Sequence, residues 1–248
     1  MRCLWGLFCD LMLLPLAALL TLYEAVIGTE SEYDNSDDND DIPPILLLHG
    51  AGFNQSEWIV ARYYLKKAGF HSIWSLNMDH VIRPRSNSMG IREYAYSKVR
   101  PFVRSIIKKT GKREIVIIGH SMGGLVGAYY KQCFAARDDV VVKMVITIST
   151  PWHGAPLLSK FAAHSKNTAR VDMTPGSELL SLLHSLTKPY AHEYRYVTST
   201  ADWAVPGSYG ISYARHTKQY LIYDWLGHYW TVLYPETWHK VIEWLKDE

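Results

Sequence analysis

One stretch of the sequence carries the residue types of an activated nucleophile. It reads Gly119-His120-Ser121-Met122-Gly123-Gly124 and directly follows the apolar run IVII at 115–118. A G-x-S-x-G pattern between a buried strand and a helix is typical of a sharp turn that raises a serine above the edge of a sheet. Glycines flank the serine because side chains there would collide within the turn. The pattern predicts Ser121 as a nucleophile at a helix N-terminus, where the helix dipole favours developing negative charge.

A serine hydroxyl is a weak nucleophile and needs a base, which an acid must orient. In proteins with such a turn, the acid and then the histidine follow the serine along the chain. We predict Asp202 as the acid, because it follows the strand-like run YRYVTST; Asp224 is the reserve candidate. The alternative for Asp202 is a loop carboxylate that caps its own turn. We predict His228 as the base, because it lies in the loop between the last expected strand and the last expected helix.

The tetrahedral intermediate of acyl transfer needs two N–H donors. Met122, directly after the serine, is predicted to supply one of them. The other is expected from the loop after the first strand of the domain, where we choose Ala51, with Gly52 or Phe53 as alternatives. His49 in this loop is expected to bond loop backbone, and the histidine beside the nucleophile is expected to pack in the turn.

The elements that must position these residues alternate between strands and helices. Apolar runs predict strands at 45–48, 70–76, 114–118, 140–148, 194–198 and 219–223, and helical patterns lie at 56–68, 93–110, 125–137 and 235–246. Continuously apolar strands indicate a mostly parallel sheet covered by helices on both faces. The residues at 154–190 are expected to form a small lid or flap. Its apolar residues at helical spacing either pack in the core or contact acyl chains.

Taken together, these residues resemble the α/β-hydrolase fold and, within it, small ester-cleaving lipases and carboxylesterases. The resemblance covers 45–248 and rests on the turn around Ser121 and on LLLHGAG, ISTPWHGAP, DMTPGSELL, ADWAVP and GHYWTVLYPETWHKVIEWL. Trp152 stands where these lipases usually have a histidine, which puts any role of that histidine in doubt.

The resemblance implies that Ser121 attacks the carbonyl of an acyl ester or lipid. His228 would accept and return the proton, Asp202 would orient His228, and water would cleave the acyl-enzyme. No cofactor is implied, and the sequence shows no metal-ligand spacing. The alternatives are acyl transfer or amide cleavage by the same three residues, or a non-catalytic binding module.

The chain of 248 residues divides into an acidic beginning and a basic remainder. Residues 1–41 hold one basic and nine acidic residues, which leaves 25 basic and 15 acidic residues for the rest. The net positive charge of this basic remainder favours an anionic partner such as a membrane surface. No nucleic-acid-binding motif accompanies the charge, so we expect no nucleic-acid partner. The ordinary charged fraction of 20% and the aromatic content of 13% exclude a chain that is disordered throughout, and three cysteines exclude a disulfide-rich scaffold.

The first 28 residues are predicted to be a signal peptide or a signal anchor. Their uncharged run, Leu11 to Tyr23, has 13 residues, fewer than the roughly 20 of a membrane span. Both interpretations predict an exported catalytic domain, secreted or membrane-anchored on the non-cytoplasmic side. A soluble amphipathic helix is the third interpretation. Residues 29–42 are expected to be an acidic disordered linker, and 43–248 the catalytic domain.

Overall fold

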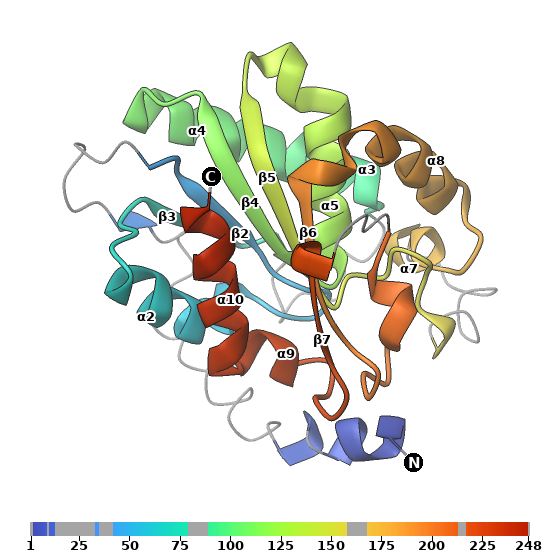
Figure 1. Ribbon diagram of the computed structural model, residues 1–248. Helices are drawn as coiled ribbons and strands as arrows, with labels where there is room; N and C mark the ends of the chain where they lie inside the picture. The colour runs from blue at the N-terminus through green and yellow to red at the C-terminus, as the bar shows by residue number, and fades with distance from the viewer. Residues whose placement is uncertain are drawn as a thin grey trace.

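The computed structural model describes residues 2–8, 10–12, 33–34, 42–78, 89–157, 168–212 and 217–247. At its centre lies a sheet with the strand order β1-β3-β2-β4-β5-β6-β7 (Figure 1). Six strands are parallel, and the two-residue strand β1 pairs antiparallel with β3 at one edge. The strands are β1 (Tyr33–Asp34), β2 (Ile45–Leu48), β3 (Ile73–Leu76), β4 (Glu114–His120), β5 (Val141–Ile148), β6 (Tyr194–Ser199) and β7 (Tyr220–Tyr223). The predicted parallel sheet is confirmed.

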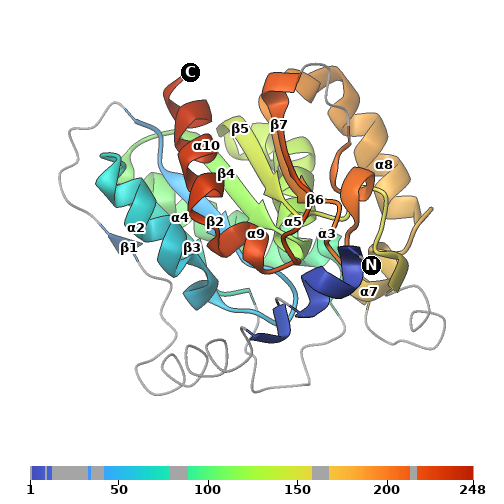
Figure 2. The ribbon, with the colours of Figure 1, turned by 60° about the horizontal axis from the view of Figure 1, so that its bottom comes forward.

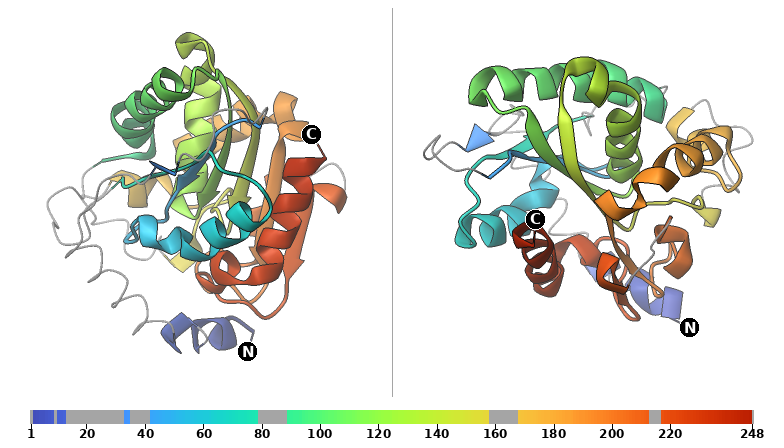
Figure 3. Two further views of the ribbon diagram at one scale, coloured as in Figure 1. Left: turned by 90° about the vertical axis from the view of Figure 1, so that its left-hand side faces the viewer. Right: turned by 45° about the horizontal axis from the view of Figure 1, so that its top comes forward.

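Helices cover both faces of this sheet, as the right-hand view of Figure 3 shows. One face carries α2 (Ile59–Lys67), α9 (Trp230–Leu233) and α10 (Pro235–Lys246); the other carries α3 (Ile91–Tyr94), α4 (Arg100–Thr110), α5 (Met122–Tyr130) and α8 (Glu178–Thr187). The remaining elements are α7 (Thr168–Asp172), the π-helical turns η3 (Ala95–Val99) and η4 (Lys131–Ala135), and the 3-10 turns η1 (Gln55–Trp58), η5 (Ala136–Asp138), η6 (Lys188–Glu193), η7 (Gly207–Gly210) and η8 (Thr217–Gln219).

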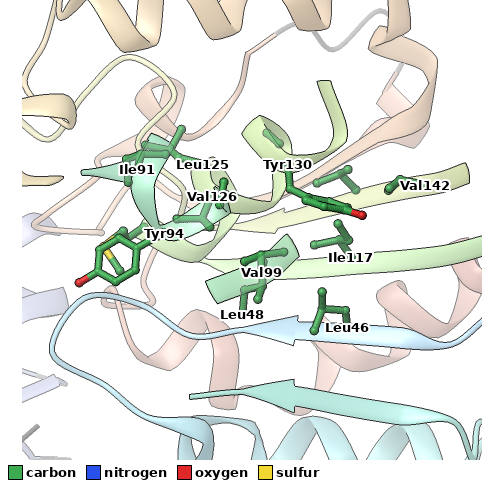
Figure 4. Packing of buried hydrophobic residues seen from close by; sticks show 14 of the residues in the cluster. Leu46, Leu48, Ile91, Tyr94, Val99, Ile117, Leu125, Val126, Tyr130 and Val142 are labelled. Carbon is green, nitrogen blue, oxygen red and sulfur yellow. The ribbon is translucent and has the colours of Figure 1, made fainter. Parts of the chain in front are cut away.

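The hydrophobic core is divided by the sheet into two clusters. Successive side chains of a strand point to opposite faces. In β2, therefore, Leu46 and Leu48 pack in the cluster under α3, α4 and α5 (Figure 4), whereas Ile45 and Leu47 pack under α2 and α10. All four are fully buried, which explains why the strands read as continuous apolar runs.

The described part of the expected flap supports the packing interpretation of its apolar residues. The stripe on α8 lies in the core cluster, with Leu179, Leu180 and Leu183 all buried. Ser177 caps this helix by accepting a hydrogen bond from the N–H of Leu180 at 3.3 Å. The earlier part of the expected flap, at 158–167, lies outside the described residues.

The beginning of the chain packs on the domain. Residues 2–8 and 10–12 are helical and lie against the loops that follow β6 and β7 (Figures 1 and 2). We call this segment the N-terminal helix. No helix of the described part of the chain is long and apolar enough to cross a membrane. The rest of the apolar stretch, at 13–28, falls outside the described residues, as does the predicted linker except for β1 and residue 42. Whether the first 28 residues form a signal peptide, a signal anchor or a soluble amphipathic helix stays a prediction from the sequence.

Candidate active site

Ser121 occupies the sharp turn between β4 and α5. Its backbone has φ 51° and ψ −122°, a strained conformation for a residue with a side chain. A Cβ atom at Gly119 would lie 2.5 Å from the backbone of Gly124, and one at Gly123 would lie 2.1 Å from the carbonyl oxygen of Leu48. Only glycine fits at these two positions, as the pattern around the serine predicted.

The three residues predicted to act together meet at the carboxyl ends of β4, β6 and β7. His228 Nε2 lies 3.0 Å from Ser121 Oγ, and His228 Nδ1 lies 2.8 Å from Asp202 Oδ2. The side chains of Asp202 and His228 are almost fully buried. This arrangement can transfer a proton from the serine hydroxyl to the imidazole while the carboxylate holds the ring in place.

The carboxylate of Asp202 both contacts the predicted base and caps its own turn, which are the two roles considered for it from the sequence. Its Oδ1 accepts hydrogen bonds from the N–H groups of Ala204 and Val205, both at 2.8 Å, and so caps its own turn. Its Oδ2 faces His228. The turn therefore fixes the carboxylate that faces the imidazole. Asp224, the reserve candidate, is exposed just after β7.

The environment of His228 sets the pH at which it can act as a base. Burial alone would lower its pKa, but the charge and hydrogen bond of Asp202, with smaller contributions from Asp10 and Glu57, raise the pKa above its ordinary value of 6.5. A base must be unprotonated, so kcat/KM should rise with pH through a midpoint above 6.5. A pH profile of kcat/KM on an uncharged ester checks this, and a midpoint below 6.5 would contradict it.

The loop after β2 lies beside the nucleophile, as an oxyanion site requires. A Cβ atom at Gly50 would lie 3.2 Å from Ser121 Cβ. The N–H of Gly50 donates to Glu57 Oε2 at 3.0 Å, and the N–H of Phe53 donates to Gly50 O at 3.3 Å. The N–H of Phe53, one of the alternative oxyanion donors, is therefore already used within the turn. The choice of Ala51, or Gly52 in its place, with Met122 at the start of α5, stays a prediction.

The sequence analysis missed Glu57, which lies buried behind the site. Its Oε1 lies 2.5 Å from His120 Nδ1, while His120 Nε2 lies 3.2 Å from the carbonyl oxygen of His228. One carboxylate therefore connects the loop after β2, the turn of the nucleophile and the loop of the base. Asn54 caps the turn η1 three residues earlier. That spacing is typical of an ordinary capping box, so it gave no signal of a buried carboxylate.

Two other side chains near the site have structural roles. His49 behaves as expected: its Nδ1 lies 2.8 Å from Gly50 O, and its Nε2 accepts from the N–H of Met78 at 2.9 Å. Trp152 is fully buried and donates from Nε1 to Thr147 Oγ1 at 3.2 Å, with its ring against the edges of two tyrosines of β6. Trp152 thus fills the core at the position where the resembling lipases carry a histidine.

Across the residues that the structure describes, no group of three or more His, Cys, Asp or Glu side chains is placed to hold a metal ion.

Comparisons with known proteins show similarity to lipases. Over 216 residues the chain is 26% identical to a triacylglycerol lipase of Pseudarthrobacter phenanthrenivorans and to one of Burkholderia plantarii. Each alignment covers 74% of this chain, but only 63% and 56% of those lipases, so the chain spans about three fifths of their length. The mature form of a Bacillus licheniformis lipase superposes with a TM-score of 0.65 at 16% identity, covering 88% of this chain and 98% of that one, which shows a shared fold.

The family comparison covers most of the domain. The model of the alpha/beta hydrolase family matches residues 45–245. The same residues hold the parallel sheet and the turn of Ser121. The chain therefore belongs to the alpha/beta hydrolase family.

Proposed function

We propose that the protein is a serine carboxylic ester hydrolase of lipase or esterase type that acts through an acyl-enzyme. The observation that carries this proposal is the continuous path from Ser121 Oγ through the imidazole of His228 to Asp202, with distances of 3.0 and 2.8 Å. The lipases among the relatives support the choice of an ester bond.

The reaction follows from the positions of these groups. Ser121 Oγ attacks the ester carbonyl carbon while His228 Nε2 takes the hydroxyl proton, and the oxygen of the tetrahedral intermediate accepts from the N–H groups of Met122 and Ala51. His228 then gives the proton to the leaving alcohol as the ester bond breaks. Water, deprotonated by the same imidazole, releases the acid and restores the serine. Asp202 remains ionised and stabilises the imidazolium in both halves.

The substrate class is proposed as acyl esters, including lipids. A series of p-nitrophenyl and glycerol esters of increasing chain length, assayed below and above the critical micelle concentration, tests this proposal. Hydrolysis of any of these esters that depends on Ser121 supports it, and a rate increase above the critical micelle concentration assigns the lipase type. Absence of hydrolysis throughout the series would overturn it. Added alcohol or amine acceptors separate hydrolysis from acyl transfer, because dominant transfer product would contradict a simple hydrolase.

Export and membrane association stay predictions from the sequence. A cleaved signal peptide would remove the N-terminal helix, and a spanning anchor would place it across the membrane from the domain. N-terminal sequencing of the mature protein, together with fractionation of membranes, distinguishes them: a first residue at Thr29 identifies a cleaved signal.

A further inference from the structure

The N-terminal helix places a buried carboxylate between the loops of the candidate acid and base. Asp10 is 3% exposed. Its Oδ2 accepts a hydrogen bond from Trp203 Nε1 at 2.7 Å. Its Oδ1 accepts from the backbone N–H groups of Tyr229 at 3.2 Å and Trp230 at 3.4 Å. One side chain thus joins two loops that are otherwise separate in sequence.

Two of the three donors are immediate sequence neighbours of the candidate catalytic residues, and Trp230 lies two positions after His228. Trp203 directly follows Asp202, and Tyr229 directly follows His228. The bonds to Asp10 therefore fix the two loops one residue away from the contact between Asp202 and His228. A shift of either loop by a fraction of an ångström would misalign the imidazole with Ser121 Oγ.

The backbone of the N-terminal helix lies in close contact with the loops of Asp202 and His228, with no room for a side chain between them. A Cβ atom at Gly6 would lie 2.0 Å from the carbonyl oxygen of Ala201, and one at Gly227 would lie 2.2 Å from the carbonyl oxygen of Gly6. Cys3 Sγ lies 3.8 Å from the carbonyl oxygens of Thr200 and Asp202. Glycine at 6 and 227 therefore permits the close packing that lets Asp10 reach its donors.

A carboxylate in this position is costly to bury. Burial raises the pKa of Asp10, although its bonds to Trp203 and Tyr229 and the nearby His228 lower it in part. An apolar residue would avoid this cost but would leave three donors without their acceptor. Its negative charge also faces the imidazole that becomes positive during the proposed reaction. The contacts of Asp10 therefore hold the two loops in position, and its negative charge stabilises the positive charge on the imidazole of His228.

We propose that Asp10 is a positioning residue of the active site. Its carboxylate holds the loops of Asp202 and His228 at their working distance and favours the imidazolium that forms as Ser121 is deprotonated. The N-terminal helix is then part of the active enzyme. This inference rests on the proposed ester hydrolase function.

The test compares Asp10→Asn with Asp247→Asn in the full chain. Asp247 is exposed at the end of α10, so its substitution makes the same charge change without touching the bridge. Asp10→Asn should lower kcat about 10- to 100-fold with little change in KM, whereas Asp247→Asn should retain wild-type rates. Rates are normalised to the fraction of enzyme that reacts with a fluorophosphonate probe, so that misfolded protein does not contribute.

The pH profile gives a readout that a purely structural role would not move. The charged and titratable groups facing His228 are Asp202, Asp10, Glu57, His120 and Tyr229. Removing the charge of Asp10 makes the protonated imidazole less favourable, so the acidic limb of the kcat/KM profile should move to lower pH. An unchanged limb with lower activity would overturn the electrostatic part of the proposal.

A second variant keeps the carboxylate but displaces the helix. Gly6→Val should force the N-terminal helix away from Ala201 and reproduce the fall in kcat with Asp10 intact. Wild-type kcat in both Asp10→Asn and Gly6→Val would overturn the proposal, as would full activity of mature protein that begins at Thr29. These results differ from failure of the proposed function, in which the wild-type chain itself would neither hydrolyse esters nor react with the fluorophosphonate.

Discussion

Replacing Ser121 by alanine should lower kcat/KM for ester hydrolysis by about 10⁴- to 10⁶-fold. The hydroxyl oxygen is the group that His228 Nε2 contacts at 3.0 Å, and alanine has no atom that can form the acyl-enzyme. The residual rate should exceed that of the uncatalysed reaction, because the backbone N–H donors and the substrate-binding surface remain. Steady-state kinetics on a p-nitrophenyl ester, together with labelling by a fluorophosphonate, measure both effects.

Ser97→Ala provides the matched control for this experiment. Ser97 is exposed in η3 and donates from Oγ to the carbonyl oxygen of Glu93 at 2.7 Å, away from the site. It should keep wild-type kcat/KM and full labelling. Equal labelling of wild type and Ser121→Ala, or hydrolysis by Ser121→Ala at the wild-type rate, would contradict the assignment of Ser121 as the nucleophile.

Replacing Glu57 by glutamine should affect stability and activity together. The carboxylate is buried, lies 2.5 Å from His120 Nδ1 and accepts the N–H of Gly50. Loss of a buried acceptor that leaves its donors unsatisfied costs about 1–3 kcal/mol, which lowers the Tm of a domain of this size by about 2–12 °C. The activity of the folded fraction should also fall, because Gly50 positions the loop that is predicted to hold the oxyanion. Thermal unfolding and kcat at 25 °C measure the two effects.

The pH dependence of this stability loss identifies its electrostatic origin. Burial by itself raises the pKa of Glu57, but the charge and hydrogen bond of His120, with help from His49 and the N–H of Gly50, lower it below its ordinary value of 4.5. A carboxyl whose pKa is lower in the folded state stabilises the protein above pH 4.5, and this stabilisation is lost as the pH falls through the lowered pKa. The difference between wild type and Glu57→Gln should therefore shrink in acid.

Glu93→Gln is the control for Glu57→Gln. Glu93 is exposed in the first turn of α3, so its neutralisation should change stability by less than about 0.5 kcal/mol. A Glu57→Gln protein as stable as Glu93→Gln at neutral pH would contradict the structural role of the buried carboxylate.

The parts of the fold that the sequence predicts best are those fixed by short-range rules. The six parallel strands are mostly apolar because both faces of the sheet are covered, and this pattern is visible without coordinates. The turn of Ser121 is equally visible, because its backbone admits only glycine on either side. The positions of Asp202 and His228 follow from chain order and from the ends of strands, and the structure brings both to Ser121.

The parts that escape the sequence depend on contacts between distant segments. Glu57 looks like a surface carboxylate at a helix start, and only the fold buries it against His120, 63 positions away. Asp10 looks like an interruption in an apolar leader, and its donors lie more than 190 positions later. In both cases the neighbouring sequence suggests an ordinary role for the carboxylate. The residues that bind it in the folded protein lie far away along the chain.

The opposite positions of the two termini have a practical consequence for handling this protein. The N-terminal helix lies beside the loops of Asp202 and His228, whereas α10 runs away from them and ends near the amino ends of the strands (Figure 1). Its 12 residues separate the end of the described chain from the site by about 18 Å along the helix. An affinity tag or fluorophore placed after Asp247 should leave turnover intact, while the same group fused ahead of Arg2 would lie on the side of the domain that carries the loops of Asp202 and His228.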